Sequence, residues 1–190
     1  MNNTIHAEDF TTAKGTRYRV RVSYDDFADE PWDYCDGHGP VSGWTTRDKR
    51  AGELILAADG RSKRFYNFQE AIKIAKRDGW GCAELTGNET PGEKAVKAVM
   101  ADLKHLKAWC NGEWHYAVLH VVLLDSEGEE IAGYDEYLGG VEFGYGMEYW
   151  KEEAANMAEE LERNLKTATD KQLAWLRSTC APCKVERVGI

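Results

Sequence analysis

The stretch from Trp114 to Leu124 constrains the fold most, because apolar residues lie on both of its faces. Valine, leucine and aromatic residues outnumber the polar ones, which is typical of a strand that is covered on both sides. Asn111-Gly112 breaks the chain before this stretch, and Ser126-Glu127-Gly128 offers a turn after it. We therefore expect Trp114 to Leu124 to form the central strand of a sheet.

Three further patterns predict strands. Residues from Thr16 to Tyr24 alternate strictly, with aromatic residues and valines on one face and arginines on the other. This is the period of a half-buried strand. A short strand from Glu53 to Ala58 ends at the Asp59-Gly60 turn, and another lies near Glu130 to Tyr134.

Capping signals and apolar spacing predict the helices. Thr90-Pro91-Gly92-Glu93 combines an N-cap, a proline at the first helical position and a capping-box acid. Asn67-x-x-Glu70 resembles a second capping box, for a helix that ends near Gly79. Met147 to Leu165 has an apolar side and an acidic side at helical spacing, and Thr169-x-x-Gln172 can cap a last short helix.

These elements follow the order ββααββαα, which suggests two similar halves. We therefore expect an α+β fold in which helices cover an antiparallel sheet of about four strands. The length of 190 residues favours a single domain over residues 1–190. Residues 25–50, acidic at their start and broken by prolines and glycines, are expected to form a long acidic surface loop, and residues 177–190 a C-terminal tail.

The acids are unevenly distributed along the chain. Between Asp125 and Glu160 there are 12 Asp and Glu residues against one base, Lys151, which gives a net charge of −11. Since the whole chain carries −9, the remainder carries about +2. Such a division of charge steers association with a basic partner and repels free nucleic acid from the acidic face.

The predicted compartment is the cytoplasm. No apolar run approaches the roughly 18 residues that a membrane span needs, and Met1 to Phe10 lacks the features of a signal peptide. The five cysteines are odd in number and unevenly spaced, which favours reduced thiols over a disulfide framework. We expect no interaction with membranes.

The cysteines raise the question of a metal site. Cys180-x-x-Cys183 has a spacing at which two thiolates can bind one tetrahedral zinc ion, and Cys35 and His38 have a compatible spacing for two further ligands. Separate thiols with no shared role are the favoured interpretation. We therefore predict no metal and no cofactor, with Cys35, His38, Cys180 and Cys183 as the weaker alternative.

The chain has no complete catalytic motif. A Walker loop, a dinucleotide fingerprint, a nucleophile elbow and an HExxH motif are all absent. His115 and His120 lie on opposite faces of the predicted central strand, so they cannot act together. We expect a protein that is not an enzyme, with a zinc-binding or motif-poor enzyme as an alternative.

Clustered bases could favour direct binding of nucleic acid. Arg17, Arg19 and Arg21 share one strand face, and more bases lie between Arg47 and Arg64. The isoelectric point near 5.1 opposes this interpretation. We expect these bases to be internal partners of the acidic segments, and we predict no direct contact with nucleic acid.

Three segments, Arg64 to Trp80, Leu106 to Asp125 and Leu138 to Glu142, resemble uncharacterised accessory proteins of tailed bacteriophages and prophages. The resemblance extends into the helix that follows but not into the chain after Thr167. It implies a phage accessory protein in the cytoplasm of a host bacterium, and it carries no catalytic residues. Small phage accessory proteins often inhibit host defence, as anti-CRISPR and antirestriction proteins do, and acidic ones commonly occupy a nucleic-acid site.

Closely spaced carboxylates can imitate the phosphates of DNA, which carry one charge per about 1.7 Å of duplex. We therefore expect a non-enzymatic inhibitor that binds a basic, nucleic-acid-binding host defence protein. The acids expected to bind this partner are Glu148, Glu152, Glu153, Glu159, Glu160, Asp25, Asp26 and Asp29. Two alternatives remain: acids that serve solubility alone, and a structural protein that self-associates, for example as a homodimer, through exposed tryptophans.

Overall fold

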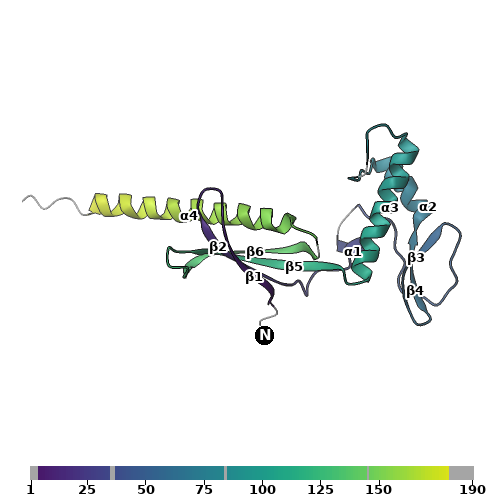
Figure 1. Ribbon diagram of the computed structural model, residues 1–190, viewed down its shortest axis with the longest axis horizontal. Coiled ribbons are helices and arrows are strands. Elements are labelled where there is room, and N and C mark those ends of the chain that lie inside the picture. Colours follow the sequence, from purple (N-terminus) through teal and green to yellow (C-terminus); the bar gives the residue numbers. More distant parts are fainter. Residues whose placement is uncertain (1–3, 35–36, 84, 145, 180–190) are drawn as a thin grey trace, which may run out of the picture. The chain divides into compact units, whose positions relative to one another are not determined.

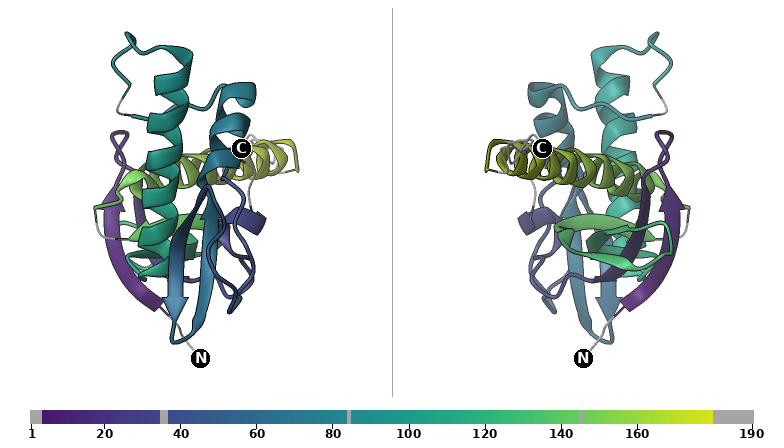
Figure 2. Two further views of the ribbon diagram at one scale, coloured as in Figure 1. Left: turned by 90° about the vertical axis from the view of Figure 1, so that its right-hand side faces the viewer. Right: turned by 90° about the vertical axis from the view of Figure 1, so that its left-hand side faces the viewer.

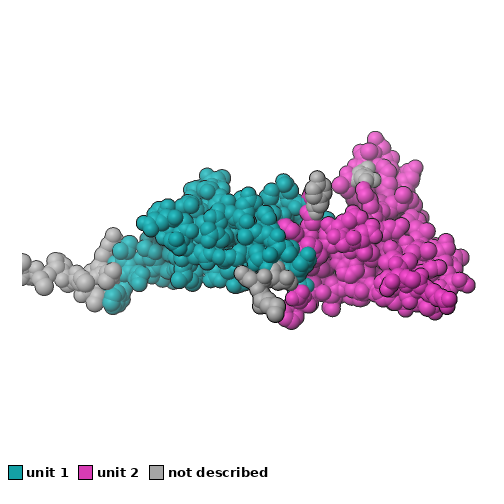
Figure 3. All heavy atoms as spheres, turned by 60° about the horizontal axis from the view of Figure 1, so that its bottom comes forward, with its two compact units in different colours: residues 1–25, 117–141, 147–190 teal, residues 26–116, 142–146 magenta. Residues whose placement is uncertain are grey.

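The computed structural model describes residues 4–34, 37–83, 85–144 and 146–179. The chain divides into two compact units (Figure 3). Unit 1 comprises residues 1–25, 117–141 and 147–190, and unit 2 comprises residues 26–116 and 142–146. The expected single domain over residues 1–190 stays a prediction, because this division does not show whether either unit folds by itself.

Unit 1 is built on an antiparallel sheet with the strand order β1-β2-β5-β6, and helix α4 runs along one of its faces (Figure 1). The elements are β1 (Thr4–Thr11), β2 (Arg17–Tyr24), β5 (Trp114–Leu124), β6 (Glu130–Gly144) and α4 (Tyr149–Thr179). The first three residues of β5 and the last three of β6 belong to unit 2. Because β5 lies between β2 and β6, its predicted central position is confirmed.

The alternation in β2 separates a buried face from an open one. Tyr18, Val20 and Val22 are buried, and the arginines between them are half-buried on the other face. Val20 pairs with Val121 of β5, so the apolar residues of the two strands share one face. Full burial of each such apolar side chain stabilises the folded state by about 1.5–3 kcal/mol.

Helix α4 is amphipathic along its first half. Its apolar side consists of Trp150, Ala154, Met157, Ala158 and Leu161, which are buried, and the half-buried Leu165. The ring of Trp150 meets the rings of His6 and Phe10 in β1 edge-on. The predicted inward side of this helix is therefore confirmed. From residue 166 to residue 175 the helix is exposed.

Unit 2 combines a hairpin with three helices (Figure 2). The elements are α1 (Pro31–Tyr34), β3 (Glu53–Asp59), β4 (Ser62–Asn67), α2 (Phe68–Asp78) and α3 (Pro91–Cys110). The capping box at Thr90 and Glu93 opens α3, as predicted. The Asn67 side chain accepts from the Glu70 amide at the start of α2, and Gly79 ends this helix with a φ of 71°.

The core of unit 2 forms between these helices and the hairpin. Tyr66, Val99 and Leu106 are fully buried in it. Beside the core, the guanidinium of Arg64 lies 4.6 Å from the ring of Trp32 and 5.1 Å from that of Trp44. Arginine stacks well on indole rings because of its flat, delocalised charge.

The predicted α+β class and four-stranded antiparallel sheet are confirmed, but the predicted order ββααββαα needs correction. The observed order is ββαββααββα. The sequence patterns miss β1, β4 and α1, and the two helices expected near the C-terminus are one continuous helix, α4. β3 belongs to a separate two-stranded sheet with β4.

Two expected irregular segments are partly structured. Residues 25–50 contain α1, and Val41 and Thr45 form bridges to β4, so part of this loop lies against a strand. The expected tail of residues 177–190 begins inside α4, and residues 180–190 lie outside the described residues. No described helix combines the length and the apolar character needed to cross a membrane.

Candidate functional site

Three of the predicted partner-binding acids share the exposed side of α4. Glu152, Glu153 and Glu160 are exposed, and none of them forms an ion pair with any residue that the structure describes. The helix rises about 12 Å from residue 152 to residue 160. Glu152 and Glu153 are adjacent and Glu160 lies about 10 Å further along the axis, so the mean interval between these carboxylates is about 6 Å, compared with roughly 3.4 Å between the phosphates of one DNA strand.

Two other predicted acids near this helix have partners within unit 1. Glu148, just before α4, pairs with Lys151 at 3.0 Å, and Glu159 pairs with Lys14 from the β1–β2 turn. Nearby, the Thr16 hydroxyl donates to Glu162. Lys14 and Thr16 thus hold α4 against the β1–β2 turn, so Glu159 has a structural contact.

The predicted loop acids divide between the two units. Asp25 belongs to unit 1 and accepts a hydrogen bond from the Gly140 amide at 2.8 Å, which joins the end of β2 to β6. Asp26 and Asp29 are exposed and belong to unit 2. Of the loop acids, Asp25 alone is therefore in the same unit as α4, and its carboxylate is engaged.

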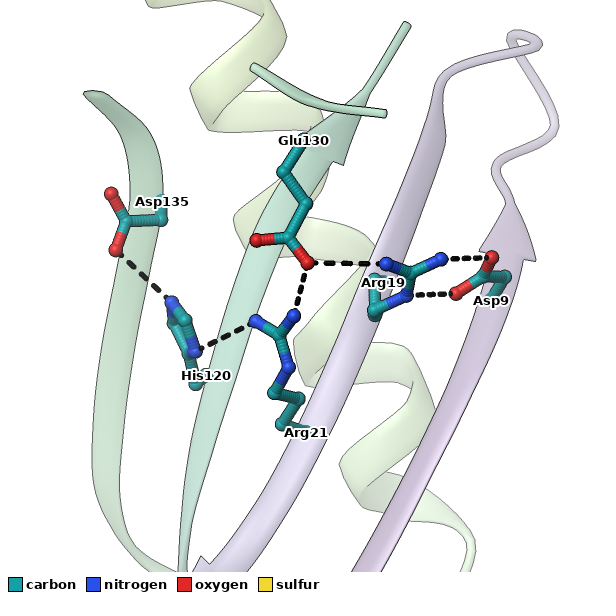
Figure 4. A network of polar contacts seen from close by, with 6 residues as sticks. All are labelled: Asp9, Arg19, Arg21, His120, Glu130 and Asp135. Atoms are coloured by element: carbon teal, nitrogen blue, oxygen red, sulfur yellow. Dashed lines mark hydrogen bonds and ion pairs between the residues drawn. The ribbon is translucent and has the colours of Figure 1, made fainter. Parts of the chain in front are cut away.

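The open face of the sheet in unit 1 carries a network of charged side chains (Figure 4). Arg19 donates to both carboxylate oxygens of Asp9, at 2.6 and 2.8 Å. Glu130 of β6 accepts from Arg19 at 3.1 Å and also from Arg21. The hydrogen bonds from Arg19 lower the pKa of Asp9. The pKa of Glu130 is also lowered, mainly by the hydrogen bond from Arg21 and to a smaller extent by that from Arg19.

His120 extends the same network towards β6. Its Nδ1 lies 3.4 Å from an Arg21 nitrogen, and its Nε2 lies 3.0 Å from Asp135 (Figure 4). The imidazole ring stacks on the exposed ring of Tyr137 at 4.1 Å. The network therefore connects all four strands across the open face.

The expected internal role of the bases is confirmed at several positions. Arg19 and Arg21 pair with Glu130, which belongs to the acidic stretch, and Arg64 pairs with Glu30 in the acidic loop. Arg17 donates to the backbone carbonyl of Asp125. The open face is thus largely neutralised by its own pairs, whereas Glu152, Glu153 and Glu160 of α4 have no such partner among the described residues.

The alternative zinc site falls mostly outside the described residues. Cys35, Cys180 and Cys183 are not described, and the Nδ1 of His38 lies 2.6 Å from Asp102 of α3. Within residues 4–34, 37–83, 85–144 and 146–179, no three His, Cys, Asp or Glu side chains are placed to hold a metal ion. The absence of a metal site stays a prediction for the whole chain.

Sequence reasoning missed Lys14 and Thr16, because each meets its acidic partner across about three quarters of the chain, at separations of 145 and 146 residues. Comparisons with known proteins add no further candidates. No family model matches the chain, and no curated protein or solved structure is significantly similar to it. The resemblance to phage proteins stays a prediction.

Proposed function

We propose that the protein is a non-enzymatic inhibitor that binds a basic, nucleic-acid-binding protein through the exposed side of α4. The observation that carries this proposal is the group of exposed carboxylates at Glu152, Glu153 and Glu160, which form no ion pair with the residues that the structure describes. A host defence protein is the proposed target, and the cytoplasm of an infected bacterium the proposed setting. Both rest on the resemblance of three segments to phage accessory proteins.

The packing of α4 supports this role. Ala154, Ala158 and Leu161 hold one side of the helix against the sheet, so the opposite side keeps a fixed direction. Lys14 adds a second attachment through Glu159. A rigid element that is ordered before binding loses little conformational entropy when a partner docks.

The distribution of paired and unpaired charge supports the same surface. Arg19 and Arg21 of the open sheet face have acidic partners, and therefore present little net positive charge to solvent. Exposed acids with no ion pair among the described residues of unit 1 remain on α4, at Glu152, Glu153 and Glu160, and also near the β5–β6 turn and on β6, at Glu127, Glu129 and Glu136. Uncompensated charge of one sign accelerates association with a partner of opposite sign and makes binding dependent on salt.

A capture experiment with matched variants tests the proposal. The immobilised wild-type protein is incubated with bacterial lysate at low salt, and bound proteins are eluted with increasing salt and identified. The test variant carries Glu152→Lys, Glu153→Lys and Glu160→Lys. The control variant carries Asp33→Lys, Asp48→Lys and Asp59→Lys, which reverse three exposed acids of unit 2 and change the net charge equally.

The wild type and the control are expected to retain a nucleic-acid-binding protein until intermediate salt. The α4 variant is expected to lose it, with an affinity lower by about tenfold or more, since reversed charges repel a basic surface. Equal capture by all three proteins would show that these carboxylates of α4 do not bind the partner. Capture that is insensitive to salt would argue against an electrostatic interface.

A further inference from the structure

Unit 2 contains a pocket of about 470 Å³ that involves none of the acids discussed above except Asp102. Its walls include the rings of His38, Trp80 and His105 and the small side chains of Ala98 and Ala101. Small-molecule sites are typically about 300–1,000 Å³ and mostly apolar, with a few convergent polar groups. The volume and the lining of this pocket both agree with that description.

Asp102 organises the polar side of the pocket. One carboxylate oxygen lies 2.6 Å from His38 Nδ1, and the other accepts from the Gly39 amide at 2.8 Å and from the Tyr66 hydroxyl at 2.6 Å. The Asp102 side chain is only 7% exposed. Because both oxygens are engaged, this carboxylate is an anchor for its neighbours and offers little to a ligand cation.

His38 is consequently held with one ring nitrogen committed. A neutral imidazole that donates through Nδ1 accepts through Nε2. The Nε2 atom of His38 has no hydrogen-bond partner among the residues that the structure describes. The pocket therefore presents one oriented acceptor that is available to a bound molecule.

The remaining wall is flat and aromatic. The ring of His105 lies parallel to that of His38, with centroids 6.0 Å apart and planes within 13°. His105 is itself fixed, since its ring stacks on Trp114 at 4.4 Å and its Nε2 lies 3.3 Å from Glu142. No lysine or arginine is among the described residues that line the pocket, so an anionic ligand has no countercharge there.

We propose that this pocket binds a small, neutral, flat aromatic molecule that carries one N–H or O–H donor. The donor meets His38 Nε2, the aromatic body lies against the rings of Trp80 and His105, and the alanines of α3 leave the space that it fills. Aromatic rings favour offset or edge-on contacts with one another. This site is independent of the acidic surface of α4, and either can exist without the other.

Indole and benzofuran form a matched pair of probes for this site. They have nearly the same shape, but only indole has an N–H donor. Binding is followed by amide chemical shifts of the full chain in two-dimensional NMR. We expect indole to shift the amides of Gly81, Ala98 and Ala101, and to bind about tenfold more tightly than benzofuran, because one hydrogen bond separates them.

Two variants locate the interaction. Ala101→Phe fills the pocket from a half-buried position on α3, and is expected to abolish binding of both probes. His38→Phe keeps a flat ring but has no acceptor, and is expected to reduce the difference between the probes while the pocket remains. Equal affinity of the wild type for both probes, absence of binding, or shifts that persist in Ala101→Phe would each overturn the proposal.

Discussion

Replacement of Asp102 by alanine should destabilise unit 2 strongly, because three donors lose their acceptor at once. The Tyr66 hydroxyl belongs to a side chain that is 0% exposed, and the Gly39 amide is also buried. An orphaned buried donor costs about 1–3 kcal/mol. With about 2 kcal/mol for the hydroxyl and about 1 kcal/mol for the amide, we expect a loss of about 3 kcal/mol. His38 is half-buried, so water can satisfy part of its loss.

Urea unfolding followed by tryptophan fluorescence measures this loss, and Tyr66→Phe provides the matched comparison. Removing the hydroxyl leaves Asp102 with two other partners, so we expect Tyr66→Phe to cost only about 1 kcal/mol. In the Tyr66→Phe background, Asp102→Ala no longer orphans a hydroxyl, and its cost should fall by about 1–2 kcal/mol. A cost of Asp102→Ala below about 0.5 kcal/mol, or strict additivity of the two changes, would refute this reasoning.

Two further predictions concern unit 2. Hydrogen bonds from Arg47 lower the pKa of Glu53 from 4.5 to about 2, so the stability that this pair contributes is present above pH 4.5 and is lost as pH falls towards 2. In Glu53→Gln, the free energy of unfolding should therefore fall less than in the wild type as the pH is lowered from 4.5 to about 2. An equal fall in both proteins would show that this pair does not cause the loss of stability in acid. A Cβ on Gly39 would lie 2.2 Å from the Tyr66 hydroxyl oxygen, so Gly39→Ala should lower the thermal midpoint by displacing that ring. Gly43→Ala meets nothing within 4 Å and is the control; equal midpoints for the two variants would contradict this explanation.

The sequence predicted those helices and strands that are determined by residues close together in the chain. The capping box of α3 involves only Thr90 and Glu93, and the inward side of α4 follows from apolar residues three and four positions apart. Strand β2 shows its period of two because one face is apolar and the other carries arginines. Each of these signals is complete within a short stretch of sequence.

The missed elements depend on distant partners. In β4, Arg64, Phe65 and Tyr66 are buried in succession, so the strand shows no alternation. Arg64 is covered because Trp32 and Trp44 stack on it, and these tryptophans come from the segment before β3. β1 is an edge strand with an irregular register near Thr4, and most of its residues are exposed. Neither strand has a pattern of its own to reveal it.

The acids of α4 could be named from sequence, but their partners could not. Glu159 and Glu160 are adjacent and chemically alike, yet only Glu159 meets Lys14. The hydrogen bonds of Asp102 could not be predicted from the sequence either, because His38 lies 64 residues away and Tyr66 lies 36 residues away. Asp102 is one of two acids in a helix that also carries four lysines, and this composition gives no local sign of such a role.

The most direct test of the central proposal is competition with DNA. A captured basic partner is purified and bound to a fluorescent DNA duplex, and the wild type, the α4 variant and the unit 2 control variant are titrated against the complex. We predict that the wild type and the control release the DNA and that the Glu152→Lys, Glu153→Lys, Glu160→Lys variant does not. Release by all three proteins alike, or a partner that binds the wild type and DNA together, would contradict the account.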